Sequence, residues 1–535
     1  MSLTSTLPAI TPIPTHPRPH LRPETLRRLS ICAAMLALLI LWAILWPQSG
    51  DGDAITHFIS ARDGLHQPWK LMGSWARVGA MLFYLIPAQF GILPARCMAA
   101  VVSIICAWQT MRMADDLALP HAIWAGPMLI FQPLVFALAA DTMTEIPMAL
   151  GLVIAIRLWW RKRWLASALV MSYLPTVRPE GFFLCALWGA MFLFNADVGN
   201  IWRRLPFAAA LATGTLAWMI AAHVFCGDAG YFLHRGWGWP ADSRALYGSG
   251  SFFSYINRIP FYCGAALFPL FLIGLRGLLR WPRVCVAGLA ILPLELIAPP
   301  SIRETVLPFA MLGILGAFAW VWRREKIAIA WWAFLLVLSV HSILWWRGWF
   351  ASAGLLRILA CVSPVIAVIC LRGWNQIQRA PLWVAAKRIV TIALLVLMPL
   401  TAMDVYAIDP IHYRIFGMRA TTQYAIDHHL LDAAPRILVR DPIAQPLLGH
   451  DVFLPLQGRA AELRRLATAP VGSIVFWDDQ REGQPQNVNL RDLSAMGYQK
   501  IFEYTQTIHR PIPRIFGRDG FLDRQKFEIL SKAHG

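Results

Sequence analysis

Charged residues are scarce in this chain, and their scarcity excludes an ordinary soluble protein. Only 15% of the 535 residues are charged, 57% are hydrophobic, and the mean hydropathy is +0.52. One apolar run follows another, and many are long enough to cross a bilayer, which takes about 20 residues. The sequence therefore predicts an all-α polytopic membrane protein.

Acidic residues are especially few, with 30 aspartates and glutamates against 48 lysines and arginines and a formal net charge of +18. Such an excess can indicate a protein that binds nucleic acid. Here, however, the basic residues lie in short clusters between apolar runs, as they do in the cytoplasmic loops of membrane proteins. We therefore expect no nucleic-acid partner and contacts with membrane lipids instead.

The nine cysteines contain no CxxC pair, which argues against a metal–thiolate site. Most lie inside apolar runs, where cysteine behaves as a small hydrophobic residue. Cys226 and Cys263 differ, because they flank one loop expected on the oxidising side of the membrane. A disulfide between them is one open alternative. The sequence also lacks the internal repeat that marks many secondary transporters.

The basic clusters predict which side each loop faces. Short basic loops stay cytoplasmic, and such clusters recur in alternate connections from 157–164 to 372–388. The segment 119–140, with "FQP" at its centre, breaks this alternation, so we expect two half-helices that enter the membrane and return. About thirteen spans result, with the N-terminus cytoplasmic and the C-terminus outside. The apolar segments lie near residues 30–47, 75–93, 95–113, 119–140, 144–160, 164–178, 180–197, 204–226, 261–280, 282–298, 303–322, 327–346, 354–371 and 386–403.

Composition divides the chain into three parts. Residues 1–29 combine prolines with basic residues and are expected to form a disordered cytoplasmic arm. Residues 30–403 form the transmembrane part, and its first run lacks a small-residue cleavage site, so we expect it to be retained. Residues 404–535 are more polar and contain short β-like runs such as "SIVFW" at 473–477. They predict a small α/β domain on the outer face.

Two acidic stretches face the expected outer side. In "SGDGDAITHF", Asp51 and Asp53 form either a polar turn with a helix cap or part of a site. The helix that follows carries His57, which we include among the substrate-binding candidates. In "ADTMTEIP", Asp141 and Glu145 are four residues apart on one helical face. Carboxylates at one membrane face suit a general base or a cation ligand, so Asp51, Asp53 and Glu145 are the catalytic candidates.

Arginines accompany these carboxylates. "YLPTVRPEGFF" places Arg178 and Glu180 at the outer end of two short spans, where a charge needs a partner or a function. An ion pair closing the helical hairpin and a role in substrate binding both stay open. Arg303 and Arg357 lie near the outer starts of later helices. They either snorkel to lipid headgroups or clamp a lipid-linked phosphate through bidentate hydrogen bonds.

This order of motifs resembles the integral-membrane glycosyltransferases of the GT-C fold. The resemblance covers residues 30–403 and is to the bacterial relatives of dolichyl-phosphate-mannose:protein mannosyltransferases and to aminoarabinose transferases. It implies that Asp53, with Asp51 beside it, deprotonates the acceptor, that Glu145 is the second acidic residue, and that Arg357 or Arg303 binds the phosphate. It also leaves open a divalent cation, Mg²⁺ or Mn²⁺, held by Asp53 and Glu145.

The resemblance implies an inverting transfer of a sugar from a polyprenyl-phosphate donor to a glycan, lipid or protein acceptor. The reaction is expected on the outer face of a bacterial inner membrane. One alternative is a transporter or flippase of an anionic lipid-linked substrate, which would use the same arginines without Asp53 as a base. A second is a membrane scaffold whose outer domain binds a partner.

Overall fold

The computed structural model describes most of the chain. Of the expected arm at 1–29, only the residues from Pro23 on are described, and they already belong to the first helix. The described residues are 23–45, 52–73, 75–194, 197, 199–234, 249–276, 291, 293–295, 297–321, 323–349, 354–381, 383–403, 414–439, 443–444, 448, 459–479, 488–507 and 524–534.

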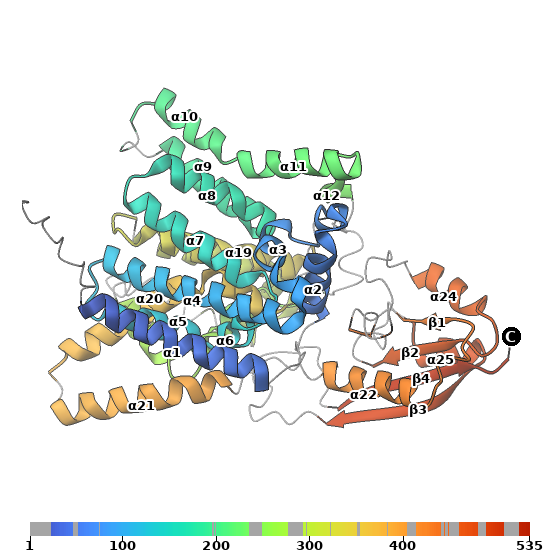
Figure 1. Cartoon of the computed structure of the whole chain (residues 1–535). Helices are drawn as coiled ribbons and strands as arrows, with labels where there is room; N and C mark the ends of the chain where they lie inside the picture. Colours follow the sequence, from blue (N-terminus) through green and yellow to red (C-terminus); the bar gives the residue numbers. More distant parts are fainter. Residues whose placement is uncertain are drawn as a thin grey trace, which may run out of the picture.

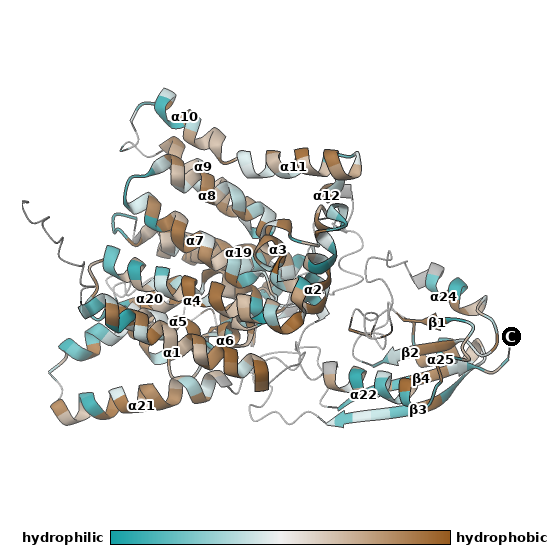
Figure 2. Cartoon of the chain, in the orientation of Figure 1, coloured by the Kyte–Doolittle hydropathy of each residue, from teal (hydrophilic) through white to brown (hydrophobic). Residues whose placement is uncertain are grey.

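Helices form one large bundle that ends at residue 403, and apolar residues colour most of it (Figures 1 and 2). The longer helices are α1 (Pro23–Leu45), α4 (Ile92–Asp116), α7 (Glu145–Trp160), α8 (Trp164–Val177), α9 (Glu180–Phe194), α10 (Ile201–Ala210), α11 (Thr213–Cys226), α18 (Pro300–Val321), α19 (Ala328–Arg347), α20 (Ser363–Arg379) and α21 (Val384–Met403). The short elements between them are α2 (Gly52–Gly64), η1 (Pro68–Leu71), α3 (Val78–Tyr84), η2 (Pro87–Phe90), η3 (Ala122–Trp124), α5 (Ala125–Ile130), α6 (Pro133–Ala139), α12 (Tyr231–His234), α14 (Ser254–Asn257), α15 (Ile259–Cys263), α16 (Phe268–Gly274) and η6 (Leu356–Val362).

Within the described residues, seven helices are long and apolar enough to cross a membrane, or eight if one bent pair counts as a single span. That pair is η3–α5 and α6, which meet at 76°. Gln132 is extended and Pro133 has no N–H to continue the helix, so the predicted interruption at "FQP" is confirmed. The expected return to the same side is wrong, because Pro120 at one end of the segment accepts from Asn375 near the end of α20, whereas Thr142 at the other end donates to the Ala54 carbonyl of α2. The count of about thirteen spans stays a prediction.

The expectation of a span at 75–93 is wrong. In its place the chain forms the short helix α3 and the 3₁₀ turn η2. Pro87 lacks the N–H that would extend the first helix, and Gly91 adopts a φ of 110°, which ends the second. This segment therefore lies among the short elements that join the spans.

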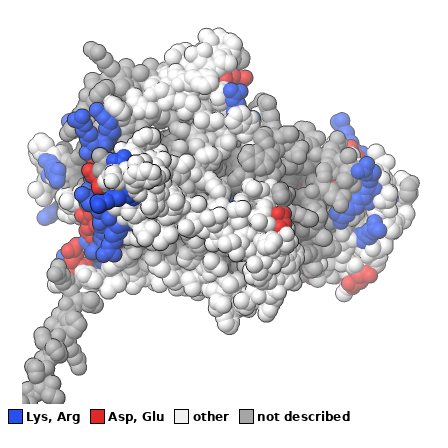
Figure 3. All heavy atoms as spheres, turned by 90° about the horizontal axis from the view of Figure 1, so that it is seen from above, with Lys and Arg blue, Asp and Glu red and all other residues white. Residues whose placement is uncertain are grey.

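Basic and acidic side chains gather at one end of the bundle (Figure 3). Arg28 at the start of α1 lies 2.5 Å from Asp115 at the end of α4. Asp116 lies 2.7 Å from Arg157 and 2.9 Å from Arg161, at the end of α7. These ion pairs join Arg28 and the arginines of the 157–161 loop, which were predicted to be cytoplasmic, to the end of α4, which the predicted alternation of spans placed outside. That placement of the end of α4 is wrong, because the chain forms no span at 75–93 and α4 therefore ends at the basic end of the bundle.

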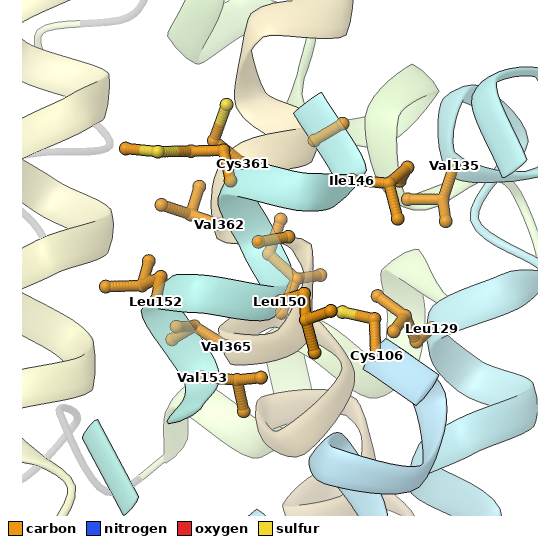
Figure 4. Close-up of a cluster of buried hydrophobic side chains, with 14 of the residues drawn as sticks. Cys106, Leu129, Val135, Ile146, Leu150, Leu152, Val153, Cys361, Val362 and Val365 are labelled. Carbon is orange, nitrogen blue, oxygen red and sulfur yellow. The ribbon is translucent and has the colours of Figure 1, made fainter. Parts of the chain in front are cut away.

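The interior between α4, α7 and α20 is filled by aliphatic side chains and cysteines (Figure 4). Helices can approach closely where a residue is small, which favours van der Waals packing in membranes. A Cβ on Gly373 of α20 would lie 1.9 Å from the Leu270 carbonyl oxygen of α16. A Cβ on Gly274 would in turn lie 2.0 Å from the Ile369 carbonyl oxygen, so the two helices touch through their backbones.

Cys226 and Cys263 are both free thiols. Cys226 ends α11 and is half-exposed, whereas Cys263 ends α15 and is fully buried in the bundle core. The disulfide alternative is therefore wrong, because both thiols are free and that of Cys263 is buried in the bundle core.

The C-terminal region forms a sheet flanked by helices (Figure 1). Its strands are β1 (Ile437–Leu438), β2 (Ile474–Asp478), β3 (Tyr498–Thr507) and β4 (Arg524–Lys532), in the order β1-β2-β4-β3, with β1 parallel to β2 and the other pairs antiparallel. Its helices are α22 (Arg414–Asp427), α24 (Arg459–Ala467) and α25 (Leu490–Ala495). Side chains alternate across a strand, so Phe476 faces the core on the α22 side and Trp477 the core on the α24 side.

The bundle contacts this region through α2. Ile55 of α2 packs against the core on the α22 side. In Figure 1 the sheet lies at the end of the bundle away from the start of α1. The helix that begins beside Asp53 therefore lies next to the C-terminal region, far from the basic end.

Candidate functional site

Asp53 lies in the first turn of α2, where a carboxylate is favoured because the helix dipole is positive at its N-terminus. Its side chain pairs with Arg357 of η6, which follows it by 304 residues. The pairing brings the first acidic stretch against the arginine that the sequence suggested for phosphate binding. Asp51 lies outside the described residues.

Two hydrogen bonds tie α2 to the second acidic stretch. The His57 Nδ1 donates to the Thr142 carbonyl at 3.2 Å, and the Thr142 hydroxyl donates to the Ala54 carbonyl at 2.6 Å. Burial, together with the charges of Arg77 and Arg178, lowers the pKa of His57 from 6.5 to about 3. His57 is buried and neutral, so in this structure it fixes α2 in position.

Glu145 is the first residue of α7 and is fully buried. One of its oxygens lies 2.7 Å from Arg178 Nη1, and the other accepts the Thr144 N–H at 3.1 Å. Asp141 precedes the helix and caps the Thr142 N–H at 3.0 Å. The expected common helical face of Asp141 and Glu145 is therefore wrong, because α7 begins only at Glu145.

Arg178 and Glu180 form the ion pair that was one of the two sequence interpretations. Arg178 Nε and Nη2 lie 3.2 and 3.0 Å from the two Glu180 oxygens. Gly181 permits this hairpin, since a Cβ there would lie 2.3 Å from the backbone of Leu174. Arg178 also contacts Glu145, so the pair does more than close a turn.

Arg357 joins the two halves of the site. It pairs with Asp53, and its Nε lies 3.6 Å from the Glu145 oxygen that Arg178 also contacts. Glu180 in turn accepts from His341 Nε2 of α19 at 3.0 Å. Carboxylates and guanidiniums thus alternate into the bundle, and the imidazole of His341 follows the last carboxylate. We name this series the charge chain, and its members in order are Asp53, Arg357, Glu145, Arg178, Glu180 and His341.

Arg303 lies apart from the charge chain. It belongs to the first turns of α18 and is half-buried, and no ion pair joins it to any residue in the described parts of the chain. Of the two arginines proposed from the sequence, only Arg357 meets the acidic residues.

Sequence reasoning missed Arg77. It precedes α3 with a φ of 57°, a left-handed conformation that is strained for a side chain of this size. Burial and the nearby Arg178 lower its pKa to about 10, while Glu180, Glu145 and Asp53 act in the opposite direction. Arg77 is thus a cation beside the charge chain, and no ion pair of it is found among the residues described.

His341 was also missed, although a signal was present. It interrupts the apolar run "VLSVHSILWW", and an ionisable residue inside a membrane helix is by default a candidate for function. Arg77 did not stand out in the same way, because it lies at the start of the predicted span 75–93, where an arginine can snorkel to the lipid headgroups.

The carboxylates Asp53 and Glu145 were suggested as cation ligands. Arg357 contacts both, and no group of three or more His, Cys, Asp or Glu residues that could hold a metal occurs within the described residues. A Mg²⁺ or Mn²⁺ ion at these two carboxylates would need its remaining ligands from water and a substrate phosphate, as Mg²⁺ commonly has.

The apolar helices define an integral membrane protein, and the comparison with solved structures confirms the fold that the sequence resemblance implied. The chain is structurally similar to ArnT from Cupriavidus metallidurans, in a crystal structure bound to undecaprenyl phosphate and in another in the apo state. The TM-scores are 0.54 and 0.53 at 11% sequence identity, over 96% of this chain and 98% and 100% of those chains. No family model and no curated protein matches the sequence.

Proposed function

We propose that the protein is an inverting glycosyltransferase that moves a sugar from a polyprenyl-phosphate donor to an acceptor hydroxyl. One observation carries the proposal: Asp53 and Glu145, which are 92 residues apart, share contact with the single guanidinium of Arg357. A base and a phosphate-binding cation are thereby adjacent. The fold shared with a protein crystallised with undecaprenyl phosphate supports the same donor class.

Arg357 and Arg77 are the proposed binding groups for the donor phosphate. A guanidinium forms bidentate hydrogen bonds with phosphate oxygens, and Arg77 supplies a second cation near the same carboxylates. Arg178 is engaged by Glu145 and Glu180, so its role is to hold Glu145 in place beside Arg357.

The reaction needs one proton transfer and one bond exchange. Asp53 accepts the proton of the acceptor hydroxyl, whose oxygen forms a bond to the anomeric carbon of the sugar. The bond between that carbon and the phosphate oxygen breaks, and the lipid phosphate leaves with a second negative charge. Arg357, released from Asp53 when the donor binds, stabilises that charge.

The basic end of the bundle is the proposed cytoplasmic side, since basic loops stay inside. The charge chain, α2 and the C-terminal region then face the outside of an inner membrane, with the N-terminus cytoplasmic. Residues 404–535 would serve as an extracytoplasmic domain beside the site, where an acceptor glycan, lipid or protein arrives.

A divalent cation remains part of the proposal as an alternative to Arg357 at the two carboxylates. When bound it would supply further positive charge to the donor phosphate, with Asp53 and Glu145 as its protein ligands. Turnover measured in EDTA and after addition of Mg²⁺ or Mn²⁺ tests this. A loss in EDTA that Mg²⁺ reverses favours the cation, and unchanged turnover favours Arg357 alone.

The full-length protein in lipid vesicles tests the whole proposal. It would receive a radiolabelled polyprenyl-phosphate sugar and a membrane extract as the source of acceptor. Label in an acceptor that is no longer attached to the polyprenyl lipid is the expected result. Movement of donor across the vesicle membrane without transfer would favour the transporter or flippase. The absence of both transfer and movement would favour a scaffold.

A further inference from the structure

His341 lies at the buried end of the charge chain, on the bundle-facing side of α19. Its side chain is 1% exposed, and its Nε2 lies 3.0 Å from Glu180 Oε1. The opposite ring nitrogen, Nδ1, is buried and makes no hydrogen bond to any residue that the structure describes. The contact with Glu180 is therefore the one through which this ring acts on the site.

Glu180 passes that contact on to Arg178. The same carboxylate oxygen lies 3.0 Å from His341 Nε2 and 3.0 Å from Arg178 Nη2. A carboxylate held by two donors from different helices loses much of its rotational freedom, and the bidentate Arg178 contact then has a fixed direction. Arg178 Nη1 then donates to the Thr144 hydroxyl at 2.9 Å and lies 2.7 Å from Glu145 Oε1, an ion-pair contact.

We propose that His341 is a positioning residue for the phosphate-binding end of the site, acting through Glu180, Arg178 and Glu145 on Arg357. This inference rests on the proposed glycosyltransferase function. Its physical basis is that the buried charges share partners. Removing the hydrogen-bond donor of His341 leaves one oxygen of Glu180 with fewer hydrogen bonds than it had. Arg178 then turns toward Glu180, and Glu145 is less well held beside Arg357.

The opposing interpretation is a histidine that merely fills space beside Tyr255, whose ring centroid lies 6.0 Å away. The packing and positioning interpretations predict different effects for substitutions that keep either the ring volume or the hydrogen-bond donor. His341→Gln keeps a terminal N–H donor of similar reach, His341→Asn keeps a shorter donor, and His341→Phe keeps the ring volume without a donor. Ser342→Ala is the matched control, because Ser342 is equally buried on the next residue and its hydroxyl makes no hydrogen bond.

The experiment compares these full-length variants in vesicles, with donor KM, acceptor KM and kcat measured separately. His341→Phe is expected to raise the donor KM about tenfold or more, as for loss of a charge-assisted hydrogen bond, with the acceptor KM unchanged. The donor KM of His341→Gln should be close to that of the wild type, and that of His341→Asn should be raised nearly as much as in His341→Phe. The donor KM of Ser342→Ala should match the wild type. Binding of polyprenyl phosphate alone is measured in parallel.

Two results would overturn the inference. A normal donor KM in His341→Phe, with only a lower melting temperature, would make the ring a packing residue. An equal defect in His341→Gln and His341→Phe would mean that donation to Glu180 is not its role. If His341→Phe fails to fold, the comparison of Gln with Asn still decides. Failure of the wild type both to bind polyprenyl phosphate and to transfer sugar would instead overturn the proposed function.

Discussion

Arg178 and Glu145 meet at 2.7 Å across the boundary between two helices, with both side chains almost completely buried. Arg178 directly follows the last residue of α8 and Glu145 begins α7, so the contact needs both helix ends at one depth in the bundle. A buried pair of this kind is a costly way to gain stability. Its position next to Arg357 fits the proposed role of Arg178, which is to hold Glu145 beside that arginine.

Asp53→Asn tests the base. The amide keeps the size of Asp53, but it cannot accept the acceptor proton, so turnover should fall by roughly 10²–10⁴. Donor binding and expression should persist. Asp63→Asn, the same change on the same helix, is the control and should retain turnover. Near-normal transfer by Asp53→Asn together with an inactive Asp51→Asn or Glu145→Gln would assign the base elsewhere.

Arg357 is expected to set donor affinity. Arg357→Ala should raise the donor KM or abolish turnover, since each charge-assisted hydrogen bond contributes roughly 1.5–3 kcal/mol. Arg357→Lys keeps the positive charge but cannot form two parallel hydrogen bonds to a phosphate. Its donor KM should therefore lie between those of Arg357→Ala and the wild type. Exposed Arg347, substituted in the same ways, serves as the control. Full recovery by Lys would indicate a simple cation, and unchanged kinetics in Arg357→Ala with a defect in Arg303→Ala would move the phosphate site to Arg303.

The neutral His57 predicts a dependence of stability on pH. Its pKa is about 3 in the folded chain and 6.5 when exposed, so below pH 6.5 the unfolded chain binds a proton that the folded chain does not. Stability is therefore lost as the pH falls, by about 2 kcal/mol at pH 5 from this group alone. His57→Gln keeps a donor for Thr142 and should remove that part of the acid loss of melting temperature. Exposed His66→Gln should leave the pH curve of the wild type unchanged.

The orientation of the chain can be checked with reporters. A periplasm-active reporter fused after residue 403 should be active, and one fused at the 322–326 connection, near the basic end, should be inactive. The reason is the clustering of arginines at the end of the bundle opposite α2. A cytoplasmic signal after residue 403 would contradict the proposed membrane orientation.

The acidic and basic residues of the charge chain were found in the sequence where a polar side chain interrupted an apolar context. Asp53, Glu145, Arg178, Glu180 and Arg357 could be predicted in this way. Their pairing could not, because a contact across 304 residues such as Asp53 with Arg357 depends on how the helices pack.

The fold was predictable where a local signal was strong. The break at 119–140 follows from Pro133, whose missing N–H acts locally. The segment 75–93 was predicted to be a span because its composition matches one. Pro87 and Gly91 instead divide it into a short helix and a 3₁₀ turn. Strand β4 was also not predicted. Lys526 and Glu528 interrupt its apolar residues Phe527 and Ile529, so the sequence shows no continuous apolar run there.

The close backbone contact at Gly181 has a consequence for which part of the site can move. Arg178 sits in a hairpin whose two helices touch through their backbones, with no room for a side chain between them. Arg357 instead lies on η6, a 3₁₀ segment, which has weaker hydrogen-bond geometry than an α-helix. One cation is therefore anchored and the other is carried by a softer support, so entry and exit of a lipid phosphate should be accompanied by displacement of η6 while the Arg178 hairpin stays still.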